Sequence, residues 1–421
     1  MICAALCGCS GTVGGQVGGD AGWPADSQHG GTDSANVSDA AALDGAPRDA
    51  ERTDVPALDV APQDVSPAPD VTLDAAPTDV WAFDATPQDV VGPADAEPGD
   101  VALSDAQGAD AGGGTGTVGP RITSFTPSGP ITVSTGQIVT GLHITAANGP
   151  CIQGSNVTNV HIHDNRIGPC GASIDPNGIG ISMEDAAAIQ IDHNSFDDIA
   201  SAFYVTGYNG GGSDLYFHHN HATRIRGPLP RGQLVQFNNV RGSGNQILCN
   251  VSEQTSPGYG AGPEDHINMF SSQGTPASPI RYAYNKIRGG GPSQSGGGML
   301  AGDNDGAYFI MESNILIDPG QYGIAVAGGH DVQMLNNKVY SPTAHAWSNN
   351  GAFVWNQYAP PCYNITARGN RVYYINRDGL PNAGWNAGNC GTVAGWDTDN
   401  NWTDQTLSES IWDEVFPECQ E

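Results

Sequence analysis

Apolar and polar residues alternate in short segments along the second part of the chain. The segment around Ile267 and Met269 is one example, and a second around Ile280 and Tyr282 follows it after a turn. Such alternation predicts a β-strand with one buried face, because successive side chains on a strand point to opposite sides. The same signal recurs at residues 179–181, 203–205, 235–237, 267–269, 299–301, 324–326 and 353–355. The pattern therefore predicts many short strands.

An asparagine follows these segments at intervals of 23 to 35 residues, at Asn165, Asn194, Asn220, Asn250, Asn285, Asn314, Asn337 and Asn370. This repeat predicts an all-β, right-handed parallel β-helix, a single-stranded solenoid, in which strands share one core and equivalent asparagines hydrogen-bond between coils. A β-propeller would need four strands per blade and a longer period. We expect the β-helix to occupy residues 119–421, with a cap from about residue 385 that includes a short helix at 408–416.

Residues 10–118 have a different composition. From Gly11 to Gly112, 20 Asp and Glu residues face two Arg, a net charge of −18 out of the formal −30 of the 421-residue chain. Low hydrophobicity and high charge predict a disordered acidic tether rich in Pro, Ala and Asp, and calcium binding by its aspartates is the alternative. The charge balance argues against nucleic acid as a partner.

Residues 1–9 are interpreted as the remnant of a lipoprotein-type signal. Leu6-Cys7-Gly8-Cys9 resembles a bacterial lipobox, in which the last cysteine is acylated, so we expect lipidation at Cys9. Simple secretion or a chance match are the alternatives. Since no run of about 20 apolar residues is present, we expect contact with a membrane only through this N-terminal lipid anchor. The prediction is an exported monomer, either an outer-membrane lipoprotein or a cell-surface or extracellular protein.

Six further cysteines lie in the predicted β-helix, and an even number in an exported chain predicts disulfides. Cys151 with Cys170, and Cys362 with Cys390, are the expected pairs because each lies within about one repeat. The pairing of the other two is left open. Metal binding is the alternative, but no Cys-x-x-Cys or paired histidine spacing supports it.

The alternation also predicts an outer strip. With the apolar residues of 235–237 and 267–269 in the core, Gln236, Asn238 and Asn268 face solvent on neighbouring coils. Coils stack about 4.8 Å apart, so residues distant in the sequence become neighbours. We expect substrate to bind through Gln236, Asn238, Asn268 and Arg288. A long polar strip suits an extended sugar chain, so a polysaccharide is the expected partner.

Part of the chain, about 50 residues, resembles pectate lyases. Ile191–Phe196 matches their Ile-Asp-His-x-Ser/Thr-Phe segment, and His218–Asn220 is followed by Arg226-x-Pro-x-x-Arg231 and a strand ending in Asn238-Asn239. The resemblance implies a parallel β-helix in which Arg226 abstracts the proton α to a uronate carboxyl group and Arg231 binds the acid group. The acidic calcium-binding strand of that family is replaced by Ala202–Val205. We therefore expect membership of the pectate-lyase-like superfamily, with Ca²⁺ as a possible cofactor. The alternative for both arginines is surface pairing with local acids.

A second set of candidate catalytic residues precedes the 267–269 strand. Glu264, Asp265 and His266 are adjacent and titratable, and Asp303 is expected one rung away. Two carboxylates could act as the acid and base of an inverting glycoside hydrolase, with His266 as a proton shuttle. The alternative is that they cap turns. Asp303 and Asp305 could instead bind Ca²⁺, although Asp-Asn-Asp-Gly is also common turn chemistry.

Together these features predict a polysaccharide lyase that cleaves a uronate-containing polymer by β-elimination. An inverting glycoside hydrolase on the same fold is the second hypothesis. A non-catalytic glycan-binding protein or adhesin is the third, since a fold does not determine a function. Aromatic residues late in the chain either form a sugar-stacking surface or fill the end of the solenoid.

Overall fold

The computed structural model describes residues 117–228, 230–254, 263–293 and 296–420. Their strands form a 10-stranded and a 19-stranded sheet, and all pairings between these strands are parallel. The helical elements of this part are two short 3-10 helices, η1 (Glu409–Asp413) and η2 (Pro417–Cys419). The fold is therefore all-β with long parallel sheets. The predictions for Cys9 and for the tether up to residue 116 fall outside the described residues.

The 19-stranded sheet contains two runs of strands that share β20. Run 1 consists of β2 (Ile131–Thr132), β5 (Ile152–Ser155), β8 (Ile181–Glu184), β11 (Phe203–Thr206), β14 (Val235–Asn238), β17 (Ile267–Gln273), β20 (Met299–Glu312), β22 (Tyr322–Val326), β25 (Asn350–Val354) and β28 (Gly384–Asn386). Run 2 consists of β3 (Ile138–Thr140), β6 (Thr158–His163), β9 (Ala187–Asp192), β12 (Ser213–His218), β15 (Gln246–Leu248), β18 (Ile280–Ala283), the end of β20, β23 (His330–Leu335), β26 (Tyr363–Arg368) and β29 (Val393–Ala394).

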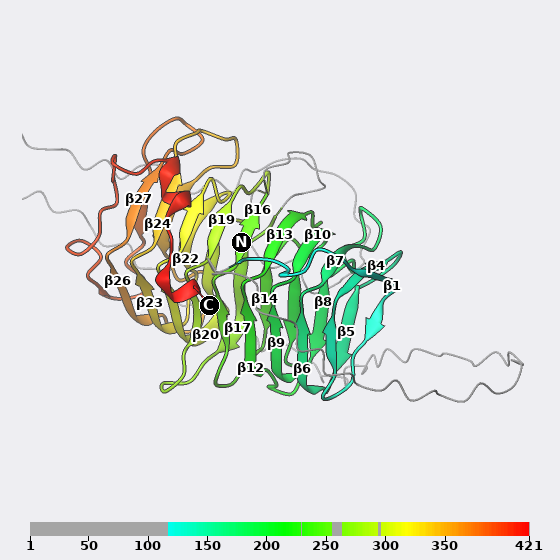
Figure 1. Ribbon diagram of the computed structural model, residues 1–421. Coiled ribbons are helices and arrows are strands. Elements are labelled where there is room, and N and C mark those ends of the chain that lie inside the picture. The colour runs from blue at the N-terminus through cyan, green and yellow to red at the C-terminus, as the bar shows by residue number, and fades with distance from the viewer. Residues whose placement is uncertain (1–116, 229, 255–262, 294–295, 421) are drawn as a thin grey trace, which may run out of the picture. The chain divides into compact units, whose positions relative to one another are not determined.

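The 10-stranded sheet is run 3: β1 (Thr126–Ser128), β4 (Leu142–Ala146), β7 (Arg166–Cys170), β10 (Ser195–Ile199), β13 (His221–Ile225), β16 (Val251–Glu253), β19 (Lys286–Arg288), β21 (Ile315–Ile317), β24 (Lys338–Ser341) and β27 (Arg371–Tyr374). Each coil passes through the runs in the order 1, 2, 3, and each strand pairs with its equivalents in the neighbouring coils. Figure 1 shows these strands following one another in chain order. This arrangement is compatible with a solenoid.

The core lies between the runs and is built by stacking equivalent residues. Val235 pairs in register with Ile267, and Ile267 with Met299, and all three are fully buried. Parallel pairing in register places apolar side chains directly above one another at the spacing of about 4.8 Å between strands. The alternation in the sequence thus becomes continuous apolar rows.

The predicted asparagine ladder is present. From Asn165 to Asn370, each side-chain Nδ2 donates to Oδ1 of the next asparagine along the stack, at 2.8 to 3.1 Å. The residue before each of these asparagines, from Asp164 to Gly369, has a positive φ between 51° and 68°. This left-handed residue turns the chain from run 2 to run 3, and the buried asparagine pairs with backbone groups that the corner removes from the sheet.

The ladder contains one more asparagine, Asn400, than the repeat predicted from the sequence. Asn370 donates to Asn400, and β28 and β29 still pair with β25 and β26. The expectation that the repeat stops near residue 385 was therefore wrong. Trp385 and its neighbours interrupt the apolar alternation without ending the pairing.

The C-terminal segment covers the outer face of run 3. Leu407 and Ile411 pack against Ile315 and Ile317, whose side chains point away from the main core. The expected helix at 408–416 is only the five-residue η1, capped by the Ser408 side chain, which accepts from the Ser410 amide. The segment thus lies along the flank of the stack.

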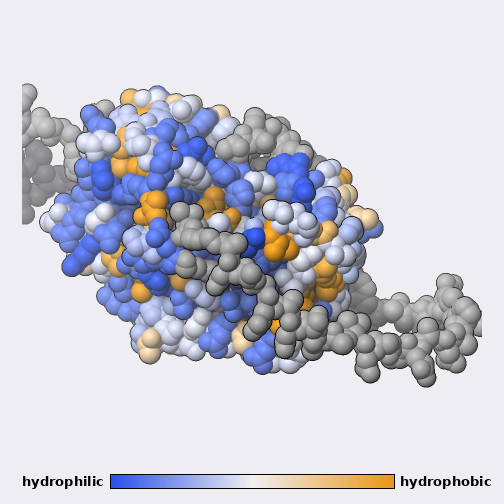
Figure 2. All heavy atoms as spheres, in the orientation of Figure 1, coloured by the Kyte–Doolittle hydropathy of each residue, from blue (hydrophilic) through white to orange (hydrophobic). Residues whose placement is uncertain are grey.

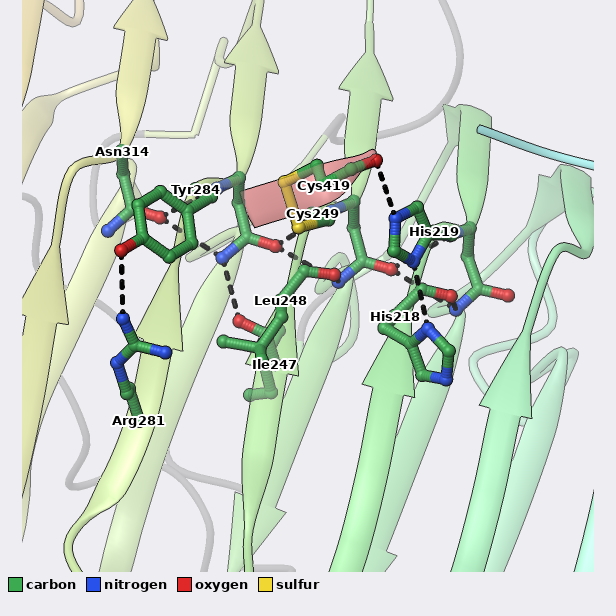
Figure 3. The surroundings of a disulfide bond; sticks show 12 residues. His218, His219, Ile247, Leu248, Cys249, Arg281, Tyr284, Asn314 and Cys419 are labelled. Carbon is green, nitrogen blue, oxygen red and sulfur yellow. Dashed lines mark hydrogen bonds between the residues drawn. A yellow bond between two sulfur atoms is a disulfide. The ribbon is translucent and has the colours of Figure 1, made fainter. Parts of the chain in front are cut away.

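Three disulfides link the described cysteines. Cys151–Cys170 and Cys362–Cys390 were predicted, and the pair that the sequence left open is Cys249–Cys419. Figure 3 shows this third bond beside the asparagine ladder, with His219 close to the carbonyl oxygen of Cys419, 3.1 Å from its Nε2. It joins residues 170 positions apart and fastens the C-terminal segment to the β15–β16 corner.

The described part of the chain has hydrophilic and hydrophobic residues on its surface. No helix within it is long and apolar enough to cross a bilayer. The face in Figure 2 is largely hydrophilic, with hydrophobic residues in small separate patches.

Candidate active site on the outer face of run 1

The outer face of run 1 carries the predicted polar strip. Tyr204, Gln236 and Asn268 are paired in register on β11, β14 and β17. On the next outward row, Asn238 pairs with Phe270, and Phe270 with Asp303. Residues up to 99 positions apart in the numbering, Tyr204 to Asp303, therefore become one surface.

The strip is less exposed than the sequence suggested. Gln236 and Asn268 were expected to face solvent, but each is only 5% exposed. Gln236 Nε2 donates to Asn238 Oδ1 at 2.8 Å and to Asn268 Oδ1 at 3.4 Å. The side chains are thus neighbours in a connected polar network, whose geometry is fixed more firmly than that of freely solvated amides.

Asn268 joins two carboxylates. Its Nδ2 donates to Asp265 Oδ2 at 2.6 Å and to Asp303 Oδ2 at 3.0 Å. The two oxygens can be no farther apart than the sum of these distances. The sequence placed Asp265 and Asp303 near one another, and the structure brings them together on one amide group.

Each carboxylate also receives a tyrosine hydroxyl from a later coil. Tyr322 on β22 donates to Asp265 Oδ1, which also accepts from the Gly297 amide at 3.1 Å. Tyr358, which follows β25, donates to Asp303 Oδ1. Neither tyrosine was singled out as a partner of these acids, because no sequence spacing connects residues on coils so far apart.

Burial sets the protonation of the acid pair. Desolvation raises the pKa of Asp265 well above its ordinary value, and the nearby charges of Glu264 and Asp303 raise it further. Desolvation also raises the pKa of Asp303. Hydrogen bonds act in the opposite direction at both acids, from Tyr322 and Asn268 at Asp265 and from Tyr358 and Asn268 at Asp303. Burial thus shifts both carboxyl groups toward the protonated form, and the charge of Glu264 adds to this shift at Asp265.

Glu264 lies beside this pair but bonds elsewhere. Its Oε2 accepts from the Ser293 hydroxyl at 2.5 Å, and Ser293 Oγ also accepts from the Gly296 amide at 2.9 Å. Glu264 thus binds Ser293, which in turn accepts from Gly296, and its negative charge acts on Asp265.

His266 does not reach the acid pair, so its assignment as a proton shuttle was wrong. Its side chain is fully buried, with Nε2 2.8 Å from the Gly289 carbonyl oxygen and Nδ1 3.4 Å from Ser252 Oγ on run 3. Alternation sends His266 and Asp265 to opposite sides of the chain. Burial lowers the pKa of His266 to about 4, so the ring is neutral at neutral pH.

This buried neutral ring predicts a loss of stability in acid. The unfolded chain takes up the proton near pH 6.5, whereas folded His266 resists it until about pH 4. The free energy of unfolding should therefore fall by up to about 3 kcal/mol as the pH drops through this window. NMR titration of the ring, assigned with a His266→Gln variant, should show a midpoint near 4. A midpoint near 6.5 would show that the ring is not buried as described.

Arg231 lies at the other end of the strip. Its guanidinium stacks on the Tyr204 ring at 4.0 Å, and Nη1 donates to the Tyr204 hydroxyl at 3.1 Å. Asn238 Nδ2 donates to the same hydroxyl. Arg231 Nε is buried and has no hydrogen-bond partner among the described residues. The predicted acid-binding arginine thus packs on a residue of the strip, with its Nε buried.

Arg226 has a structural position that does not suit a catalytic base. It is 1% exposed, pairs with Asp198 at 3.1 Å and donates to the carbonyl oxygens of Cys170, Asp175 and Gly227. These bonds hold the guanidinium between loops that follow β7 and β13. The motif is present, but its first arginine is used to join coils.

Arg288 was also misplaced. It is on β19 of run 3, where it pairs with Glu409 at 3.2 Å and stacks on Trp412 at 4.5 Å. It holds the C-terminal segment and does not contribute to the run 1 strip. The three residues of β19 are too few for their apolar and polar pattern to show whether the strand belongs to run 1 or run 3.

An aromatic surface continues the strip beyond the acid pair. Leu300, Tyr322, Ala325, Ala327 and Phe353 form a separate buried cluster, with Trp355, Tyr358 and Trp385 packed against it. In the 353–355 segment the inward residue is Val354, not Phe353 or Trp355, because Val326 pairs with Val354. The inward and outward positions expected for residues 353–355 were thus shifted by one residue. With the observed register, Phe353 and Trp355 both lie on the outer face.

The residues proposed for Ca²⁺ are not joined. Asp303 takes its hydrogen bonds from Asn268 and Tyr358, while Asp305 lies farther along β20 and is partly exposed. Within the described ranges, no group of three or more His, Cys, Asp or Glu side chains is arranged to hold a metal ion.

Comparison of the chain with protein-family models, curated proteins and solved structures finds no match.

Proposed function

We propose that the three runs form a right-handed parallel β-helix of the pectate-lyase-like kind and that the outer face of run 1 hydrolyses an acidic polysaccharide. One observation carries the proposal: Asp265 and Asp303, on neighbouring coils, both bond to the Asn268 amide in a buried setting. Paired carboxylates with different proton affinities are what glycoside hydrolysis requires.

The two acids have distinct roles in this proposal. Asp265, whose pKa is raised by burial and by the Glu264 charge, donates a proton to the oxygen of the leaving sugar. Ionised Asp303 attacks the anomeric carbon as the bond to the leaving sugar breaks, which forms a glycosyl ester. Water then hydrolyses this ester, and Asp265 takes up the proton that the water releases. Inverting enzymes hold their carboxylates about 6.5–9.5 Å apart to admit a water, and retaining enzymes about 5–5.5 Å. The short link through Asn268 favours retention over the inversion expected from the sequence.

The rest of the strip supports an acidic sugar chain as substrate. Arg231 brings a planar guanidinium, a group that matches a carboxylate, to the end of the strip near Tyr204. The aromatic residues beyond the acid pair, Trp355 and Trp385 among them, suit stacking on sugar rings. A sugar chain bound along run 1 would contact Arg231 at one end, the acid pair Asp265 and Asp303 in the middle, and the aromatic surface at the other end.

β-Elimination is the second candidate, and Arg231 favours it. A lyase must neutralise the uronate carboxyl group, and the Arg231 guanidinium could do this. The arginine carried over as the base, Arg226, is held by Asp198 and three carbonyl oxygens. Hydrolysis is preferred because its acid pair is already assembled.

A substrate panel separates these candidates. The full-length protein is incubated with polyuronates and neutral polysaccharides, and both reducing ends and absorbance near 235 nm are followed. New reducing ends without 235 nm absorbance support hydrolysis. A matching rise in both signals supports elimination, and binding to a glycan without either signal supports the adhesin hypothesis.

Arg231→Gln should weaken the binding of acidic substrates and leave the binding of neutral substrates unchanged. Loss of a charge-assisted hydrogen bond is worth about 1.5–3 kcal/mol, so KM for a polyuronate should rise roughly 10- to 100-fold with little change in kcat. KM for a neutral substrate of the same length, if cleaved, should not change. Equal effects on both substrates would show that Arg231 does not read the acid group.

The proposed setting is outside the cytoplasm. Three disulfides in the described residues fit an oxidising compartment. Lipidation at Cys9 and a monomeric state remain predictions. Mass spectrometry of the protein isolated from its own membranes would detect the acyl groups.

A further inference from the structure

Tyr358 reaches the acid pair from a segment outside the strands. It lies between β25 and β26, and its hydroxyl donates to Asp303 Oδ1. The Gln357 amide donates to the Ala327 carbonyl oxygen at 2.9 Å, which places the segment against the end of β22. The partner of Asp303 is therefore held by loop contacts, not by a sheet.

Tyr322, the partner of Asp265, is held differently. It lies on β22, is almost fully buried, and its backbone pairs with β25. Its position is fixed by the same sheet that carries Asp303. Each tyrosine donates one hydrogen bond to one of the two acids. Only the position of Tyr358 depends on how its loop is anchored.

The loop is anchored at both ends to the next coil. At its start, the Asn356 amide donates to Asn389 Oδ1 at 2.8 Å, and Asn389 Nδ2 donates back to the Asn356 carbonyl oxygen at 2.9 Å. At its end, Cys362 is bonded to Cys390. The disulfide and the paired asparagines thus fasten the whole segment to residues 389–390.

We propose that Tyr358 is a positioning residue for Asp303 and that the Cys362–Cys390 disulfide completes the site by holding Tyr358 in place. This rests on the proposed role of Asp303 in catalysis. The Tyr358 hydroxyl fixes the rotation of the carboxyl group, so that Oδ2 faces Asn268 and the sugar-binding face. Without the disulfide, the Tyr358 loop would keep its asparagine anchor and lose the other.

The test compares Tyr358→Phe and the double variant Cys362→Ala/Cys390→Ala with wild type on the polysaccharide that the panel identifies. Misplacement of a reacting group by about 1 Å can cost on the order of 100-fold, so kcat/KM should fall by about that factor in both variants. The acidic limb of the pH profile should move to higher pH, since a lost hydrogen bond to a carboxylate raises its pKa. An unshifted limb in Tyr358→Phe would overturn the positioning role.

A second readout does not need activity. Carbodiimide coupling to glycine ethyl ester, followed by peptide mass spectrometry, should label Asp303 faster in both variants than in wild type. Hydrogen exchange of the Gln357 amide should accelerate in the disulfide variant. If wild type cleaves nothing but these changes occur, the hydrolase proposal fails and the positioning inference stands.

Matched controls separate site formation from general stability. Cys151→Ala/Cys170→Ala removes a disulfide at the other end of the described coils, and Tyr363→Phe alters an exposed tyrosine near the loop. Neither should change Asp303 labelling or the pH profile. Equal changes in the Cys151–Cys170 control would overturn the role assigned to Cys362–Cys390.

Discussion

Replacing Asp265 with Asn should reduce kcat by about 10²–10⁴-fold, the usual contribution of a general acid. The buried carboxyl group, with Glu264 and Asp303 nearby, keeps its proton at neutral pH and can deliver it to the leaving sugar. An asparagine of nearly the same shape cannot. Rates at saturating substrate for wild type and Asp265→Asn measure the effect directly.

The pH profile provides the control for this prediction. Because protonated Asp265 is the active form, wild-type activity should fall as the pH rises above its raised pKa, and this limb should vanish in Asp265→Asn. Asp305→Asn changes a partly exposed aspartate on β20 and should retain activity. Full activity in Asp265→Asn, or an equal loss in Asp305→Asn, would remove Asp265 from the mechanism.

Replacing Asn285 with Ala should cost about 3–5 kcal/mol of unfolding free energy. The change leaves the Asn250 amide and Nδ2 without the acceptor that Asn285 Oδ1 provides, and leaves the Ile247 carbonyl oxygen without a donor. These groups are buried, and each unsatisfied group costs about 1–3 kcal/mol. The melting temperature should fall by on the order of 10 °C.

Asn209→Ala is the matched control for the ladder. Asn209 is exposed and donates to Asp185 at 2.6 Å, so water can replace its bonds. Its loss should change stability by less than about 0.5 kcal/mol. If denaturant unfolding gives the same small change for Asn285→Ala, the ladder does not stabilise the coils as described.

The sequence predicted features that depend on a repeat. Asn194 and Asn220 recur because each coil makes the same corner, so a spacing along the chain becomes a contact in space. The neighbourhood of Gln236, Asn268 and Asp303 follows from the same regular stacking. Parallel pairing in register converts local alternation into long-range order.

Contacts that break the repeat could not be predicted. Cys249–Cys419 depends on the path of the C-terminal segment, and Tyr358 reaches Asp303 through a loop whose shape no alternation encodes. Arg226 carries the expected motif, yet its environment is set by loops from three coils. The residue types and their spacing identified Arg226 as a candidate, but the burial and hydrogen bonds of its side chain determine its role.

The most direct measurement is a crystal structure of the Asp265→Asn variant soaked with hexagalacturonate. The account predicts a sugar chain along run 1, with a carboxyl group at Arg231 and rings against Trp355 or Trp385. A glycosidic oxygen should lie between Asp303 and the amide side chain that replaces the Asp265 carboxyl group. A chain bound on run 2 or run 3, or one that crosses run 1 away from the acid pair, would contradict it.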